Sequence, residues 1–159
     1  MPSADDEEEF VSPVTAGLAV SGFLPAFPAR TDAVLCLCLP VEMAQARRHG
    51  YPDPLTCGGL AEYAWRPIAD DFAAPPSLDW LDATARLLCA WRKAGRTVLV
   101  HCAAGISRSP TVAAAYLMNK YRWGAAEALA LVKTARPVID PNGGLRDLLV
   151  RYESLALAA

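Results

Sequence analysis

Residues 97–118, TVLVHCAAGISRSPTVAAAYLM, decide the fold of this chain. The apolar run TVLV predicts a buried strand, and PTVAAAYLM, which begins with proline, predicts a helix. HCAAGISRS is the short loop between them. Backbone N–H groups of such a loop, together with the N-terminus of the next helix, bind a tetrahedral oxyanion. The stretch therefore predicts a strand–loop–helix unit that cradles a phosphate group.

A thiol and a guanidinium occupy this loop, because Cys102 and Arg108 are separated by five residues. A helix N-terminus stabilises the thiolate, which is the nucleophilic form of cysteine. The planar fork of an arginine matches two oxygens of a phosphate. Taken alone, a buried cysteine or a surface arginine would be ordinary. Placed together in one loop, they indicate a nucleophile and a phosphate clamp.

The length and composition favour one globular domain. A chain of 159 residues buries enough surface to fold without a metal or a disulfide. A net charge of -2 and a pI near 5.6 disfavour a nucleic-acid partner or an anionic membrane surface. No apolar run approaches the ~20 residues of a spanning helix, and the acidic start is unlike a secretory signal.

The cysteine count indicates a reducing compartment. Five cysteines form no paired framework, which predicts free thiols in the cytoplasm, with the nucleus as a second location. Cys36 and Cys38 have the spacing of half a metal site, but no second ligand pair follows, and His49 and His101 are the only histidines. Two buried strand thiols are the favoured interpretation, so we expect no metal and no cofactor.

The remaining pattern predicts an α/β fold with a small mixed sheet flanked by helices. Residues 1–9 form an acidic, flexible tail, and residues 10–159 form a single domain. Strands are expected over 10–20, over the apolar run 33–39 and over 61–68. Helices are expected over 41–48, from Leu78 to Gly95 with Ser77 as N-cap, and over 109–121, 124–135 and 143–157.

The stretch HCAAGISRSPTVAAAYLM resembles the signature of the atypical dual-specificity protein phosphatases, within the cysteine-based tyrosine phosphatase superfamily. Each fixed position is present: His-Cys, two variable residues, Gly, one variable residue, then Ser-Arg-Ser. ARPVIDPNGG (135–144) resembles the connection to the family's C-terminal helix. The resemblance implies a single-domain phosphatase fold and a metal-independent hydrolase. Its substrates would be phosphotyrosine and phosphoserine or phosphothreonine in phosphoproteins, with a monomer as the default state.

The resemblance also implies a role for each residue of the loop. Cys102 forms a cysteinyl-phosphate, Ser109 donates a hydrogen bond to the departing sulfur, and His101 orients the loop. Gly105 lets the backbone curl close to the oxyanion. The phosphate is bound by Ala103, Ala104, Gly105, Ile106, Ser107 and Arg108.

The leaving group needs a proton, so a general acid is expected on a separate loop. Asp70 and Asp71 are the candidates. Alignment on the Pro-Ile-Ala run at 67–69 selects Asp70, whereas alignment on the Asp-Phe-x-x-Pro pattern of related phosphatases selects Asp71. We prefer Asp70, and the other carboxylate is then a solvated turn residue.

A redox role for Cys38 is a further expectation. Parallel strands deliver their C-terminal ends to one edge of a sheet, which brings the end of the strand over 33–39 near the active loop. In some relatives a cysteine there forms a disulfide with the oxidised nucleophile. The alternative is that Cys38 is a small buried hydrophobe.

Two departures from the family pattern leave the substrate open. A Leu-Tyr-Leu-Gly stretch common in the family reads LAVSG here (18–22), so a tyrosine is missing from the rim of the pocket. The loop carries no lysine, which disfavours a highly charged inositol lipid. A phosphatase of phosphoglucan, RNA 5′-phosphate or lipid, a phospho-binding module with weak turnover, and a sulfurtransferase or arsenate reductase remain alternatives.

Overall fold

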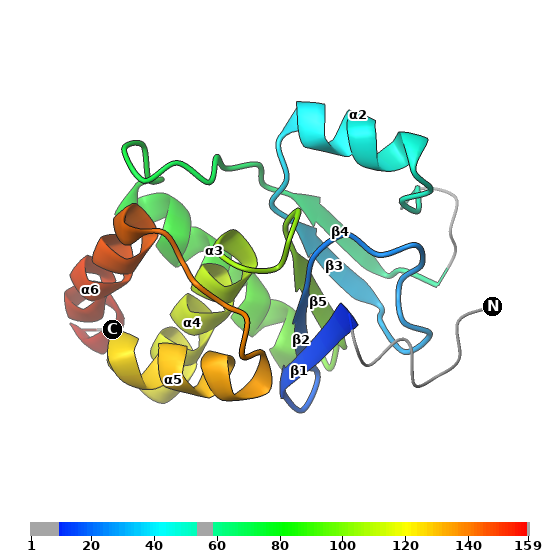
Figure 1. Ribbon diagram of the computed structural model, residues 1–159. Coiled ribbons are helices and arrows are strands. Elements are labelled where there is room, and N and C mark those ends of the chain that lie inside the picture. The colour runs from blue at the N-terminus through cyan, green and yellow to red at the C-terminus, as the bar shows by residue number, and fades with distance from the viewer. Residues whose placement is uncertain (1–9, 54–58, 159) are drawn as a thin grey trace.

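A mixed five-stranded sheet forms the centre of the computed structural model, which describes residues 10–53 and 59–158 (Figure 1). The expected acidic tail and Cys57 lie outside the described residues. Strand order is β1-β2-β5-β3-β4, with β1 and β2 antiparallel and the other neighbours parallel. The strands are β1 (Val11–Thr15), β2 (Leu18–Ser21), β3 (Ala33–Cys36), β4 (Glu62–Trp65) and β5 (Val98–His101). The predicted α/β class and mixed sheet are confirmed.

The strand expected over residues 10–20 is wrong in one respect, because the segment forms a hairpin of two strands. Gly17 has a φ of +84° between β1 and β2, a conformation that favours glycine and reverses the chain. The strands expected over 33–39 and 61–68 are also shorter than predicted. The chain continues alongside its neighbour beyond β3, where Leu37 N donates to the carbonyl of His101 at 3.0 Å.

Each helix expected from the sequence is present, with ends close to those predicted. Ser77 caps its helix as expected, since its hydroxyl accepts a hydrogen bond from Trp80 N at 3.1 Å. Within 10–53 and 59–158, no helix combines the length and apolar character that a membrane crossing requires. The described helices are α2 (Pro40–Arg48), α3 (Leu78–Lys93), α4 (Arg108–Tyr121), α5 (Ala125–Ala135) and α6 (Gly143–Ala158).

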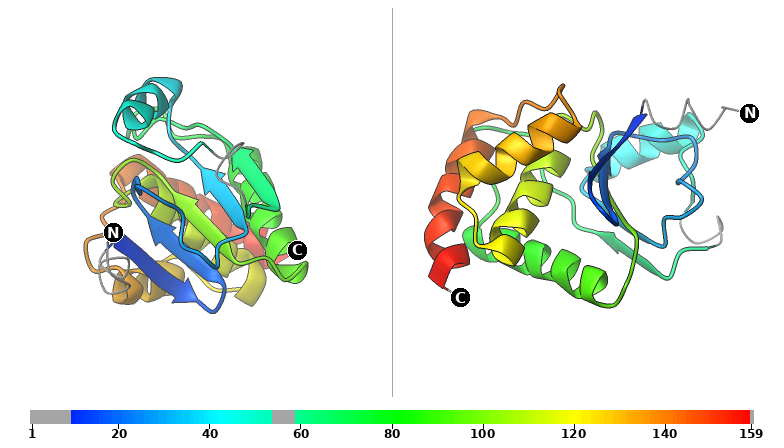
Figure 2. Two further views of the ribbon diagram at one scale, coloured as in Figure 1. Left: turned by 90° about the vertical axis from the view of Figure 1, so that its right-hand side faces the viewer. Right: turned by 90° about the horizontal axis from the view of Figure 1, so that it is seen from below.

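The helices cover the two faces of the sheet unequally. Helices α3, α4, α5 and α6 gather on one face, while α2 lies apart from them at the other side (Figures 1 and 2). Helix α4 is buried at every position from Arg108 to Met118, because it is packed by the sheet and by its neighbouring helices. The start of α4 is thus packed on all sides. It follows directly on the loop of residues 102–108, which we call the phosphate loop.

Alternation along β3 and β5 sorts their side chains between two cores. Successive side chains of a strand point to opposite faces. Leu35, Leu37 and Cys102 belong to the large core that includes the helices α3–α6. Cys36 and Cys38 belong to a smaller cluster on the α2 side. The thiol of the active loop and the two thiols of the β3 segment therefore lie in different clusters.

Candidate active site

The loop between β5 and α4 has its carbonyl groups tied to the surrounding scaffold. Because these carbonyl groups are bonded outward, N–H groups of the loop can point toward its centre. This arrangement binds an oxyanion. Gly105 N–H, for example, points to Cys102 Sγ at 3.2 Å. The outward bonds run from Phe23 N to Ala103 O (3.0 Å), from Arg136 Nε to Gly105 O (2.8 Å) and from Asp140 N to Ile106 O (2.8 Å).

Cys102 lies on the floor of this loop and is almost completely buried. Its Sγ is 3.2 Å from Gly105 N, which donates to it, and 3.2 Å from the Ser109 hydroxyl, which also lies 3.3 Å from the Ser21 carbonyl. Gly105 has a φ of +68°, and a Cβ there would lie 2.6 Å from the backbone N of Gly22. The loop therefore requires glycine at this position, for its conformation and for its close approach to the end of β2.

Arg108 is held by a partner that the sequence did not reveal. Its Nη1 and Nη2 each donate to a different carboxylate oxygen of Glu42 at 2.7 Å, and Nη1 also donates to the carbonyl of Ile68 at 3.0 Å. Its Nε is buried and has no partner among the residues that the structure describes. One face of the guanidinium is therefore fixed, and a buried donor remains for an anion.

The Glu42–Arg108 pair keeps both of its charges. The hydrogen bonds from Arg108 lower the pKa of Glu42, against the opposite effect of burial. Burial is the largest single effect and lowers the pKa of Arg108, but the hydrogen bonds to Glu42 and the nearby charges of Cys102, Glu42 and Cys38 together outweigh it, so the net shift is upward. Glu42 lies in α2 and 66 residues before Arg108. In the sequence, Glu42 was expected only as part of a helix, and nothing indicated its contact with Arg108.

Of the two candidate acids, the structure brings Asp70 to the loop. Asp70 Oδ1 accepts hydrogen bonds from Ser107 Oγ at 2.7 Å and from Asn142 Nδ2 at 2.6 Å. Asp71 is exposed and its Oδ1 accepts from Ala73 N at 2.9 Å, within its own turn. Asn142 lies in the segment that carried the family resemblance, but its contact with Asp70 was not predicted.

The segment that follows Asp70 rests on the start of α6. A Cβ at Gly144 would collide with the carbonyl oxygen of Phe72, so the backbone of the segment that follows Asp70 lies directly against this glycine. The Phe72 ring passes close to Gly143, the first residue of α6, yet its side chain is 70% exposed. The backbone therefore makes the close contact with α6, and most of the aromatic ring remains at the surface.

His101 faces away from the phosphate loop, toward the α2 side. Its Nε2 is 2.5 Å from the Tyr51 hydroxyl, and its Nδ1 is 3.3 Å from the carbonyl of Cys102 and 4.0 Å from Cys38 Sγ. The expected orienting role of His101 is compatible with these contacts. The disulfide between Cys38 and Cys102 stays a prediction, because the described contacts join Cys38 to His101.

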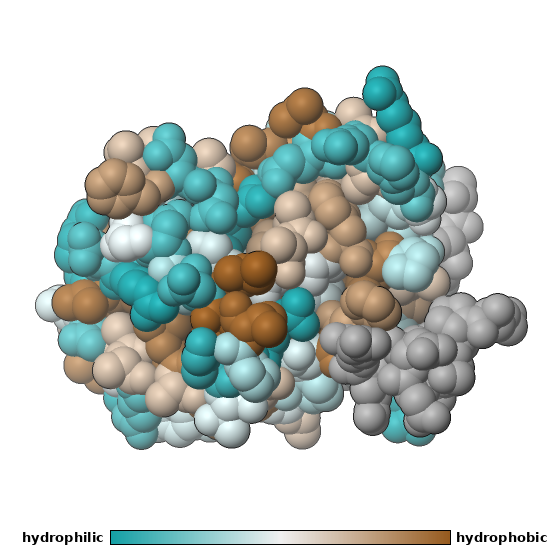
Figure 3. Space-filling model, viewed as in Figure 1, coloured by the Kyte–Doolittle hydropathy of each residue, from teal (hydrophilic) through white to brown (hydrophobic). Residues whose placement is uncertain are grey.

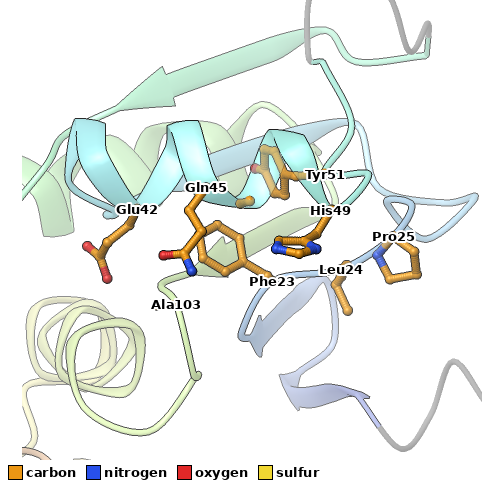
Figure 4. Close-up of a pocket in the computed structure, with 9 residues that line it drawn as sticks. Phe23, Leu24, Pro25, Glu42, Gln45, His49, Tyr51 and Ala103 are labelled. Atoms are coloured by element: carbon orange, nitrogen blue, oxygen red, sulfur yellow. The ribbon is translucent and has the colours of Figure 1, made fainter.

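A pocket of about 470 Å³ opens beside the phosphate loop (Figure 4). Phe23 and Tyr51 pack edge to face in it, with ring centres 5.4 Å apart. Glu42 reaches into it from α2, and Ala103 is contributed by the phosphate loop, so the pocket adjoins the loop directly. Its lining consists of Phe23, Leu24, Pro25, Glu42, Gln45, Ala46, His49, Tyr51 and Ala103.

Apolar side chains are also exposed near the loop. Ile106 is 39% exposed and Val138, in the connection from α5 to α6, is 60% exposed. Figure 3 shows brown, hydrophobic surface in the middle of the face where these two segments run. The surroundings of the phosphate loop are therefore mixed, with apolar surface beside the polar groups of the loop.

A family model and the sequences of known proteins agree on one family for this chain. Residues 41–155 match the family model described as dual specificity phosphatase, catalytic domain. Human dual specificity protein phosphatase 5 is 40% identical over 98 residues, which is 62% of this chain and 25% of that protein. Human dual specificity protein phosphatase 14 is 45% identical over 92 residues, or 58% of this chain and 46% of that protein. The chain thus spans about a quarter to a half of these relatives' lengths.

Solved structures agree with the sequence matches. The crystal structure of human DUSP28 has a TM-score of 0.75 and 30% sequence identity, and covers 94% of this chain and 95% of that one. A human tyrosine phosphatase-like serine/threonine/tyrosine-interacting protein has a TM-score of 0.79 at 24% identity and 92% coverage of this chain, a likeness of fold alone. With the family model matching most of its length, the chain belongs to the dual-specificity phosphatases, within the cysteine-based protein tyrosine phosphatase superfamily.

Proposed function

We propose that this chain hydrolyses phosphotyrosine and phosphoserine or phosphothreonine in proteins, through a cysteinyl-phosphate and without a metal ion. The observation that carries the proposal is the position of Cys102. Its sulfur lies between the Gly105 amide and the Ser109 hydroxyl, in the loop that ends at the buried, unpartnered Nε of Arg108. A nucleophile and oxyanion donors in one loop are what phosphoryl transfer requires.

In the first step, the thiolate of Cys102 attacks the phosphorus atom, and the bond from phosphorus to the leaving oxygen breaks. Asp70 gives that oxygen its proton. Asp70 Oδ1 accepts the hydrogen bonds from Ser107 and Asn142, so the proton to be transferred is carried on Oδ2. Arg108 and the loop amides hold the phosphoryl oxygens and stabilise the charge that develops on them.

In the second step, water attacks the phosphorus atom of the cysteinyl-phosphate. Asp70, now ionised, takes a proton from this water, and the bond from phosphorus to sulfur breaks. Ser109 lies 3.2 Å from the sulfur, and its hydroxyl donates a hydrogen bond to the thiolate as it leaves. Inorganic phosphate departs and Cys102 is again a thiolate.

The pocket beside the loop supports a protein substrate over an inositol lipid. Apolar groups of Phe23, Leu24 and Tyr51 fit an aromatic ring or an apolar side chain next to the phosphorylated residue. The carboxylate of Glu42 in its lining is paired with Arg108, and none of the lining residues is a lysine or an arginine. A second phosphate of a lipid headgroup would therefore meet no lysine or arginine of this lining.

The cellular location is proposed on the state of the thiols. The described cysteines are free, and Cys36, Cys38 and Cys102 are buried. Free thiols of this kind persist in a reducing compartment, so we expect the protein in the cytoplasm or the nucleus.

The test of the function is a phosphatase assay on phosphopeptides, inositol lipids, phosphoglucan and RNA 5′-phosphate, with trapping of the phosphoenzyme by rapid acid quench. We expect phosphopeptides to be hydrolysed fastest and phosphate to be trapped on Cys102. Cys102→Ser removes the nucleophile, and Arg108→Lys replaces the bidentate fork by a point charge, so both variants should be inactive.

The alternative functions have distinct outcomes in the same assay. A phospho-binding module would bind phosphopeptides with no trapped phosphoenzyme. Faster hydrolysis of a lipid, glucan or RNA substrate would replace the protein substrate in the proposal. Activity that survives in Cys102→Ser would contradict the mechanism.

A further inference from the structure

Three side chains of metal-ligating type meet on the α2 side of the sheet. Cys36 Sγ, Cys38 Sγ and a ring nitrogen of His101 all lie within 4.8 Å of one another. Their exposed fractions are 0%, 0% and 1%. The sheet explains the meeting, because Cys36 and Cys38 alternate onto one face and the register of β3 with β5 pairs Cys36 with His101. The proposed phosphatase steps use neither cysteine.

The spacing of the three atoms fits a small cation. Points no more than 4.8 Å apart all lie within about 2.8 Å of a common centre, and Zn–S and Zn–N bonds are about 2.3 and 2.1 Å long. Shifts of less than about one ångström would bring the atoms to bonding distance of one ion. We propose that Cys36, Cys38 and His101 bind Zn²⁺, with a water molecule as the fourth ligand.

The chemistry of the donors selects a soft or borderline cation. Thiolate and imidazole favour zinc over magnesium and calcium, which take oxygen ligands. Two thiolates also balance the charge of Zn²⁺, so the cluster stays neutral where a net charge would be costly. Binding forms two Zn–S bonds and releases the proton of each thiol to solvent.

Tyr51 supplies the outer partner that a metal-bound histidine needs. A ligating histidine donates its second ring N–H to an oxygen, which fixes the orientation of the ring. The Tyr51 hydroxyl lies 2.5 Å from Nε2 and accepts that hydrogen when Nδ1 binds the ion. Nδ1 lies 4.0 Å from Cys38 Sγ and 3.3 Å from the Cys102 carbonyl, so binding turns Nδ1 from that carbonyl toward the thiols.

A path for the ion and the water leads through the pocket beside the phosphate loop. Ala46 and Tyr51 line that pocket and also belong to the cluster that contains Cys36 and Cys38. Figure 4 shows the Tyr51 side chain near the last turn of α2, and its ring packs against Phe23. A rotation of the Tyr51 side chain would open the cluster to the pocket.

Titration of the reduced protein with Cd²⁺, followed by the ultraviolet thiolate-to-metal absorption band, tests the site. We expect saturation at one ion per chain, and zinc X-ray absorption should show two sulfur ligands at about 2.3 Å. Cys36→Ser and Cys38→Ser should each lose most of the cadmium band. Tyr51→Phe should weaken affinity by about 10–100-fold, the usual effect of removing an outer partner.

Two control variants separate this cluster from other thiols. Cys89→Ser changes a half-buried thiol of α3 and should leave the titration unchanged. Cys102→Ser should also keep the band, whereas a metal held at the active loop would lose it. A band that persists in both Cys36→Ser and Cys38→Ser, or that vanishes in Cys102→Ser, would overturn the proposal.

If the cysteine variants fail to fold, a measurement on the wild-type protein still tests the zinc site. X-ray absorption of the wild-type protein with zinc decides independently, since fewer than two sulfur ligands contradict the site. Hydrolysis of phosphopeptides is measured on the metal-free protein in the presence of a chelator. Failure of the zinc site and failure of the proposed phosphatase function are therefore distinguishable.

Discussion

Glu42 and Arg108 form a two-pronged ion pair, with both N···O distances at 2.7 Å. The pair joins α2 to the last residue of the phosphate loop. Glu42 Oε1 also accepts a hydrogen bond from Leu39 N at 2.8 Å, at the start of the same helix. This bond helps to orient the carboxylate toward the guanidinium. The direction of the phosphate clamp is therefore set from the opposite side of the sheet from the helices α3–α6.

We expect Glu42→Gln to lower kcat/KM on every phosphomonoester, because the guanidinium loses its anchor. The loss should be similar for good and poor leaving groups, since Arg108 acts on the phosphoryl oxygens and not on the leaving atom. Steady-state kinetics on an aryl phosphate and an alkyl phosphate measure it. A loss confined to the alkyl phosphate would contradict this role.

The same substitution should change the dependence of stability on pH. The folded-state pKa of Glu42 is lowered, so its contribution is present above its unfolded pKa and is lost as the pH falls through the folded pKa. At pH 7 we expect Glu42→Gln to cost about 1–3 kcal/mol, less than for a fully buried pair because solvent reaches Glu42. Urea unfolding at neutral and acidic pH should show the two proteins converging in acid.

Asp70→Asn should reduce turnover by about 10²–10⁴-fold on substrates with poor leaving groups. The loss should be small on a substrate whose leaving group departs unaided, and the alkaline limb of the pH–rate profile should disappear. Asp71→Asn is the matched control, because its carboxylate caps only its own turn. If Asp71→Asn shows this behaviour and Asp70→Asn does not, the acid is Asp71.

Asn142 should act as a positioning residue for the acid. Its Nδ2 donates to Asp70, and its Oδ1 accepts from Leu145 N at 2.9 Å, which caps α6. Asn142→Ala should slow poor leaving groups by roughly tenfold, the effect of one hydrogen bond to a charged group. Asn142→Ser keeps a capping hydroxyl but does not reach Asp70. Asn142→Ser should therefore keep the melting temperature of the wild-type protein but hydrolyse poor leaving groups slowly. If Asn142 only capped α6, this variant would match the wild-type protein in both melting temperature and rate.

Peroxide treatment tests the expected redox role of Cys38. We expect a Cys38–Cys102 link in the peptide map and slower recovery by added thiol in Cys38→Ser. The link requires local movement, because the two side chains belong to different clusters. If Cys38→Ser recovers as fully as the wild-type protein, Cys38 has no resolving role.

The sequence predicted the local unit around Cys102 well, because strand, loop and helix are encoded within about twenty consecutive residues. It did not predict what the unit contacts. Glu42 reaches Arg108 across 66 residues, and Asn142 reaches Asp70 across 72, and neither spacing has a periodic signal. The order of the strands had to be known before these partners could be named.

The hairpin that was missed over residues 10–20 has a local physical cause. Alternation alone did not separate β1 from β2, because the positive φ of Gly17 that turns the chain has no apolar signature. The proximity of His101 to Cys36 and Cys38 was not predicted, because it arises through strand pairing.

In the proposed mechanism, the contact between Gly144 and Phe72 lets the start of α6 influence the position of the general acid. A side chain at position 144 would clash with the backbone of Phe72 and push away the segment that carries Asp70. Displacing the segment would carry Asp70 away from Ser107 while leaving the nucleophile and the clamp untouched. In the proposed mechanism, bond formation to sulfur and protonation of the leaving oxygen thus depend on separate parts of the chain, and we expect a substitution at the start of α6 to change the second without altering the first.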